Sequence, residues 1–254
     1  MKLVMIEMMS LLHQFLWPFV RVSAMLLTAP IFGTTAINIR TRVAIGAVLT
    51  LLIFQQIDVP AIDPFSFPAL TKMFHEVVVG GLMGLTLQIV SAAVILSGQM
   101  VSNGMGLGMA NMIDPNLGNV PTLSNFFLVI ALLAFLSLGG HLVLISVLVD
   151  SYSSVPIGNG MLSLASIEGF LAWTSRMFIG AVTLVLPVLV ALLMINVSLG
   201  VISRASPSLN IFAVGFPALI PAGLVLVTLT LTFYYTRLET LWYDGFRFLQ
   251  QSLF

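Results

Sequence analysis

Long apolar stretches without a single charged residue constrain this chain more than any other feature. Six of them are candidate membrane spans: residues 22–39, 43–57, 77–113, 115–149, 177–203 and 205–236. A helix rises 1.5 Å per residue and needs about 20 apolar residues to cross about 30 Å of hydrocarbon. Several of the stretches are long enough. The pattern therefore predicts an all-α membrane protein with six spans.

The composition agrees with a bilayer environment. Of the 254 residues, 59% are hydrophobic and 7% are charged, whereas soluble domains carry about a quarter charged residues. Lys and Arg together number nine, as do Asp and Glu, which argues against nucleic acid as a ligand. Cysteine is absent, so disulfides and thiolate metal sites are excluded.

The uneven lengths of the stretches indicate helices that bend or end at mid-depth. Stretch 43–57 is short for a crossing, and stretch 77–113 is too long for one. Such breaks are tolerated only where protein covers the freed backbone groups. Pro187, Pro217 and Pro221 predict kinks. We therefore expect kinked helical hairpins inside a larger assembly.

A polar, basic joint separates the last two apolar stretches. It contains Arg204, Pro207 and Asn210 within the segment SRASPSLN. Proline lacks a backbone N–H and ends or kinks a helix, so the joint predicts a helical hairpin. Counted as six spans, the chain would place Arg204 on the same side as Arg40 and Arg42, the side that the positive-inside rule assigns to the cytoplasm.

A second irregular segment, residues 98–121, is rich in glycine and methionine. It contains Met105, Met109 and Met112, followed by the turn-forming pair Asp114 and Pro115. Methionine is a flexible filler of irregular gaps, so such a segment would suit a seal that yields to a passing chain. Residues alone favour the simpler alternative, a re-entrant connection packed between helices.

Charges beside apolar helices are costly and tend to pair. We expect Arg21, Arg176 or the turn with Arg40 and Arg42 to offset Glu76, Glu168 or Asp150 between subunits. An ion path is the alternative. Gly80 and Gly84 share one helical face and permit close helix packing, either ordinary or at a subunit interface.

No catalytic, cofactor or metal site is predicted. The segment Gly104–Gly108 lacks the spacing of a nucleotide loop, no P-loop motif occurs, and the three histidines are scattered without an H-E-x-x-H motif. We therefore expect a protein that is not an enzyme.

Several segments, in order along nearly the whole chain, resemble the FliR/SctT family of type III protein-export gate subunits. They are the helix and basic turn over residues 21–44, the acidic, glycine-rich block 76–84, the loop 106–121, the helix end 140–158 and the joint 203–217. The resemblance favours the flagellar branch over the virulence branch.

The resemblance implies a single subunit in a helical hetero-oligomer with FliP and FliQ around a closed pore. Residues 1–165, with a pore loop at 98–121, would be FliP-like, and residues 170–254 would form a FliQ-like hairpin. FlhB and FlhA would be further partners, and unfolded flagellar proteins would pass through the pore. The place would be the bacterial inner membrane, in contact with lipid, at the flagellar basal body.

The resemblance also implies that the central loop is a plug. Many relatives carry bulky aromatic residues there, whereas this chain carries Met105, Met109 and Met112, so an aromatic plug does not carry over. A proton-coupled transporter of a small solute is the alternative function, supported only by the apolar composition and a few interior charges. A membrane enzyme ranks third.

Overall fold

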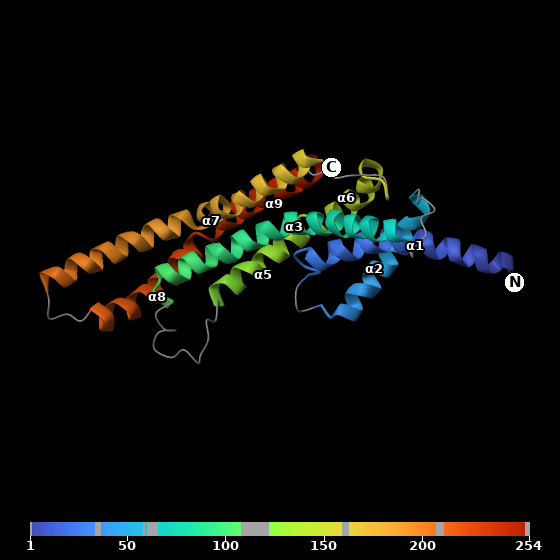
Figure 1. Cartoon of the computed structure of the whole chain (residues 1–254). Helices are drawn as coiled ribbons and strands as arrows, with labels where there is room; N and C mark the ends of the chain where they lie inside the picture. The colour runs from blue at the N-terminus through green and yellow to red at the C-terminus, as the bar shows by residue number, and fades with distance from the viewer. Residues whose placement is uncertain are drawn as a thin grey trace. The chain divides into compact units, whose positions relative to one another are not determined.

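The computed structural model describes residues 2–33, 37–57, 59, 66–107, 122–158, 163–206 and 211–251, with the backbone alone for 2–13 and 211–217. Over these residues the chain forms eight α-helices and one short 3-10 helix, without a strand (Figure 1). They are α1 (Lys2–Thr28), α2 (Ile39–Ile53), η1 (Phe54–Gln56), α3 (Phe67–Gly104), α5 (Thr122–Ser137), α6 (Gly140–Ser154), α7 (Leu164–Ala205), α8 (Ile211–Leu229) and α9 (Leu231–Gln251). The prediction of an all-α membrane protein is confirmed.

The number of membrane spans differs from the prediction. Among the described residues, three helical segments are long and apolar enough to cross a membrane: Ile39–Gln56, α3 and α7. Two bent pairs, α5 with α6 and α8 with α9, raise the number to at most five. The expectation of six spans is therefore wrong, because an uncharged stretch reports apolar surroundings and does not by itself report a crossing.

The two longest helices exceed the thickness of a bilayer. α3 has 38 residues and α7 has 42. At 1.5 Å per residue they are about 57 and about 63 Å long, roughly twice the hydrocarbon thickness. The long apolar stretch that begins at residue 77 therefore forms one helix without a break as far as Gly104.

The sharpest described bend of the C-terminal part does not lie at a proline. The part of α8 from Ala218 to Leu229 meets α9 at 61° across Thr230. The Thr230 hydroxyl donates to the carbonyl oxygens of Leu226, at 2.8 Å, and Val227, at 3.4 Å. A threonine hydroxyl that bonds back into its own helix favours bending.

The chain divides into two compact units. The first comprises residues 1–89, 135–175 and 243–254, and the second comprises 90–134 and 176–242. α3, α5, α7 and α9 each contribute to both. The division into a FliP-like and a FliQ-like part near residue 165 stays a prediction.

Each unit has its own apolar core. In the first, fully buried side chains come from α1, α3 and α6, among them Trp17, Met25, Met83 and Leu148. In the second they come from α3, α5 and α7, among them Val101, Phe127, Ala181 and Leu192. Large apolar side chains remain exposed along α7, such as Val190, Leu193 and Val201, which is the surface expected of a helix covered by lipid or by another subunit.

Candidate functional site

A buried ion pair joins α1 to α3 in the first unit. The Arg21 Nε donates to the Glu76 Oε2 at 2.6 Å, and both side chains are 0% exposed. A buried charge without a partner would be very costly, so each of these two groups depends on the other. Two of the charged residues that the sequence marked as interior therefore come together, and they do so within one chain. The expectation of pairing between subunits is wrong for this pair.

The rest of the Arg21 guanidinium caps the C-terminal end of α6. Its Nη1 donates to the Ser151 carbonyl oxygen at 3.1 Å and to the Ser151 Oγ at 3.0 Å, and its Nη2 donates to the Val155 carbonyl oxygen at 2.9 Å. The last carbonyls of a helix lack intrahelical partners and carry partial negative charge, so a cation is favourable there. Arg21 thus fastens three helices together.

Tyr152 completes this cluster. Its ring lies under the guanidinium, with the Arg21 Cζ 4.3 Å from the ring centroid. Its hydroxyl donates to the Pro18 carbonyl oxygen at 3.2 Å. Pro18 belongs to α1, so the tyrosine adds a further bond between α6 and α1. We call Arg21, Glu76, Ser151, Tyr152 and Val155 the arginine cluster.

Two glycines bring α1 and α3 close enough for the ion pair. Glu76, Gly80 and Gly84 are spaced by four residues and therefore share one face of α3. A Cβ added at Gly80 would collide with the Arg21 carbonyl oxygen, and one at Gly84 would lie 2.7 Å from the Met25 carbonyl oxygen. Close packing at these glycines therefore occurs within the chain, between α1 and α3.

The cluster occupies one of the two carboxylate oxygens of Glu76. One carboxylate oxygen is held by the Arg21 Nε, and the other, Oε1, has no hydrogen-bond partner among the described residues. The counter-charge of this carboxylate is thus fixed at 2.6 Å by the neighbouring helix α1. The arrangement is therefore structural, and it does not favour the ion path that the sequence left open.

The remaining predicted charges lie elsewhere. Arg40 is exposed at the start of α2, where the Asn38 side chain accepts from the Arg40 backbone N–H at 3.3 Å. Arg42 is half-buried, and its Nη2 donates to the Ile37 carbonyl oxygen at 3.4 Å. Asp150, Glu168 and Arg176 are exposed.

The predicted pore segment is described only at its beginning. Met105 is fully buried and packs against Gly223 of α8. Its side chain is thus taken up by packing within the second unit. Met109, Met112, Asp114 and Pro115 lie outside the described residues, so their part in a plug stays a prediction.

The predicted joint is also described only in part. Arg204 is exposed in the last turn of α7, where a cation interacts favourably with the helix dipole. α7 ends at Ala205 and α8 begins at Ile211, as the hairpin prediction requires. Pro207 and Asn210 lie outside the described residues.

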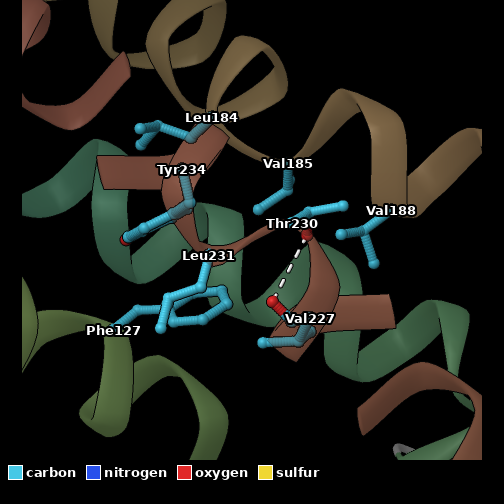
Figure 2. Close-up of a pocket in the computed structure, with 8 residues that line it drawn as sticks. All are labelled: Phe127, Leu184, Val185, Val188, Val227, Thr230, Leu231 and Tyr234. Atoms are coloured by element: carbon cyan, nitrogen blue, oxygen red, sulfur yellow. Dashed lines mark hydrogen bonds between the residues drawn. The ribbon is translucent and has the colours of Figure 1, made fainter. Parts of the chain in front are cut away.

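A small cavity of about 10 Å³ lies beside the bend at Thr230. Figure 2 shows its lining: Leu184, Val185 and Val188 of α7, Phe127 of α5, and Val227, Thr230, Leu231 and Tyr234 at the end of α8 and the start of α9. This volume is about that of one water-sized probe. No group of three or more metal-ligating side chains occurs in the part of the chain that the structure describes. The cavity is therefore a packing feature.

Comparison with known proteins decides the family. Residues 12–244 match the family "Bacterial export proteins, family 1". The chain belongs to this family. It is 34% identical to the flagellar biosynthetic protein FliR of Pectobacterium carotovorum over 232 residues, which cover 89% of this chain and 87% of the relative. It is 35% identical to the FliR of Escherichia coli K12 over 87% of this chain and 85% of the relative, and 29% identical to that of Bacillus subtilis 168 over 87% of both.

The match to the bacterial export family covers nearly all of the features described above. The arginine cluster, the described beginning of the pore segment and Arg204 all fall within residues 12–244. Sequence reasoning identified Arg21 and Glu76 but missed Ser151, Tyr152 and Val155 as their partners. Ser151, Tyr152 and Val155 lie in the segment 140–158, which the sequence marked only through its resemblance to the family. The backbone carbonyl acceptors leave no trace in the sequence that would have revealed them.

Proposed function

We propose that this chain is a subunit of the export gate of the flagellar type III protein secretion apparatus. Membership of the bacterial export family over residues 12–244 is the observation that carries the proposal. Relatives named flagellar biosynthetic protein FliR, similar over more than four fifths of both chains, support the flagellar system in particular. The place would be the bacterial inner membrane, at the flagellar basal body.

In this proposal the chain helps to form a closed pore through which unfolded flagellar proteins pass. Its partners are FliP and FliQ in a hetero-oligomer, with FlhB and FlhA alongside. The exposed apolar side chains of α7 support a role inside an assembly or a bilayer, because so much apolar surface is not stable in water. The chain itself performs no chemistry, and the energy for export comes from elsewhere.

The plug belongs to the same proposal. Met109 and Met112, with the turn at Asp114 and Pro115, would close the pore in the resting state. These side chains support the idea through their chemistry, since methionine fills irregular gaps without hydrogen-bonding demands. The hairpin joint at Arg204, Pro207 and Asn210 would face the cytoplasm.

Purification of a tagged chain in mild detergent tests the proposal. A gate subunit is expected to bring FliP-like and FliQ-like chains with it and to be unstable without them. Recovery of a stable single species that transports a small solute would instead establish the alternative transporter. The pairing of Glu76 with Arg21 gives that alternative no support, because it occupies an acid that such a transporter would use.

A further inference from the structure

The C-terminal end of α3 is in contact with α7 and α8, the two helices on either side of the predicted joint. The contacting residues all belong to the second unit. Met105, directly after α3, is fully buried. A Cβ added to Gly223 of α8 would lie 2.5 Å from the Met105 Cγ and 2.8 Å from its Sδ. The thioether therefore lies directly on the backbone of α8, at a position where only glycine leaves room for it.

α7 supplies the second hold on α3. The Asn196 Nδ2 donates to the Gly104 carbonyl oxygen at 3.2 Å. That carbonyl is one of the last four of α3, which have no partner inside the helix, so the asparagine serves as a cap from a neighbouring helix. A Cβ added to Gly104 would lie 3.2 Å from the Leu192 Cδ1. α3 ends here because Gly106, at φ 78°, takes the left-handed conformation typical of a helix C-terminus.

α7 and the α8–α9 pair each have a weak point, meaning a position where a helix bends readily. Both weak points lie next to residues that line the small cavity described above. In α7 it is Pro187, which removes one backbone hydrogen bond and lies in the sequence between two of the cavity-lining residues, Val185 and Val188. In the α8–α9 pair it is the bend at Thr230, which lines the same cavity. Helices bend most readily at such positions.

The two contacts that hold the end of α3 lie on one side of these weak points, whereas α7 also contacts α3 before Pro187, where the Trp173 Nε1 donates to the Thr86 carbonyl oxygen at 3.0 Å. Asn196 follows Pro187 by nine residues in α7, and Gly223 precedes Thr230 by seven residues in α8. A swing of the hairpin at Pro187 and Thr230 would therefore carry Asn196 and Gly223 together. That movement would withdraw both holds from the end of α3.

We propose that the hairpin arm beyond Pro187 and Thr230 is a lever, and that the packing of Met105 on Gly223 with the bond from Asn196 to Gly104 is its latch. The latch is closed at rest and opens when a protein is exported. This inference rests on the proposed function for its link to export, while the latch itself is a contact that can be tested in the purified protein.

The absence of native cysteine makes a reversible lock possible. In the double variant Met105→Cys/Gly223→Cys, oxidation joins α3 to α8 across the contact. The complex is expected to assemble, export of flagellar proteins is expected to stop on oxidation, and a reductant is expected to restore it. The single variant Met105→Cys serves as the control and should export under both conditions. Unchanged export with the pair fully cross-linked would show that this contact does not open, and the proposal would fail.

A second measurement does not depend on export. In the single variant Met105→Cys, the thiol is buried and should react slowly with a soluble maleimide in the purified complex. Adding Asn196→Ala should raise that rate severalfold, because it removes the hold from α7. Ser198→Ala is the matched control, since its hydroxyl bonds only within α7, to the Met194 carbonyl oxygen at 2.8 Å. Equal rates for the two added substitutions would refute the latch.

The two measurements separate the inference from the proposed function. If the unmodified chain supports no export, the proposed function fails, and the maleimide rates still decide whether the latch exists. If export is normal and oxidation of the cysteine pair leaves it unchanged, the proposed function stands and the lever is wrong.

Discussion

Removing one member of the arginine cluster should cost far more stability than removing an exposed arginine. Arg21→Met deletes the cation that binds Glu76 and ends four hydrogen bonds, to Glu76, to Ser151 twice and to Val155. It leaves a fully buried carboxylate without its counter-charge. Breaking a buried pair from one side costs about 3–5 kcal/mol. At 1.4 kcal/mol for each factor of ten, the ratio of folded to unfolded chain should fall by about a hundredfold to a few thousandfold.

The double variant Arg21→Met/Glu76→Leu should recover most of that loss. It removes both charges and replaces them with apolar side chains of similar size, and such replacements are often neutral or stabilising. The carbonyl oxygens of Ser151 and Val155 still lose a donor, which leaves a residual cost of about 1–3 kcal/mol. The double variant should therefore be more stable than either single variant.

Thermal unfolding and protease resistance of the purified protein in detergent measure these differences. Arg40→Met is the matched control, because Arg40 is exposed and its loss should change the free energy of unfolding by no more than about 0.5 kcal/mol. The reasoning is refuted if Arg21→Met is as stable as Arg40→Met. It is also refuted if either single variant is at least as stable as the double variant.

Three further predictions concern the glycines, the joint and the plug. Gly84→Val should prevent stable accumulation of the protein in membranes, since overpacking costs about 1–3 kcal/mol or more. Gly81→Val should be tolerated, because a Cβ there meets nothing within 4 Å. Immunoblots of membrane fractions compare the two variants. Arg204→Glu should abolish recovery of FliP- and FliQ-like partners and motility, because it opposes the positive-inside bias and the dipole of α7, and normal motility would remove the proposed role. Replacing Met109 and Met112 with Gly should make the assembled pore leak ions, and Phe at both positions should restore closure; unchanged conductance in the glycine pair would end the plug idea.

Physical rules read from the sequence anticipated part of the arginine cluster. The cost of an ion in apolar surroundings predicts that Arg21 and Glu76 seek partners. Their choice of each other depends on the close approach of α1 and α3, which the spacing of Gly80 and Gly84 permits without naming the neighbour. The caps on Ser151 and Val155 depend on where α6 ends, and backbone acceptors carry no mark in the sequence.

The path of the long helices was harder to predict. Hydropathy detects apolar surroundings, so it divided the chain into six stretches where the described residues give three to five spans. The sequence predicted kinks at Pro217 and Pro221. The 61° bend lies instead at Thr230, whose hydroxyl bonds to a carbonyl oxygen of its own helix. The break between α7 and α8 was easier to predict, because Arg204 and Pro207 between two apolar stretches favour the end of one helix and the start of another.

Secretion by the native organism tests the central claim most directly. The amount of flagellar protein in the culture medium should be measured in a strain from which the gene for this chain has been deleted, with and without a plasmid-borne copy. The proposed export-gate function predicts that secretion and motility disappear in the deletion strain and return with the plasmid. Normal secretion of flagellar proteins in the deletion strain would contradict it.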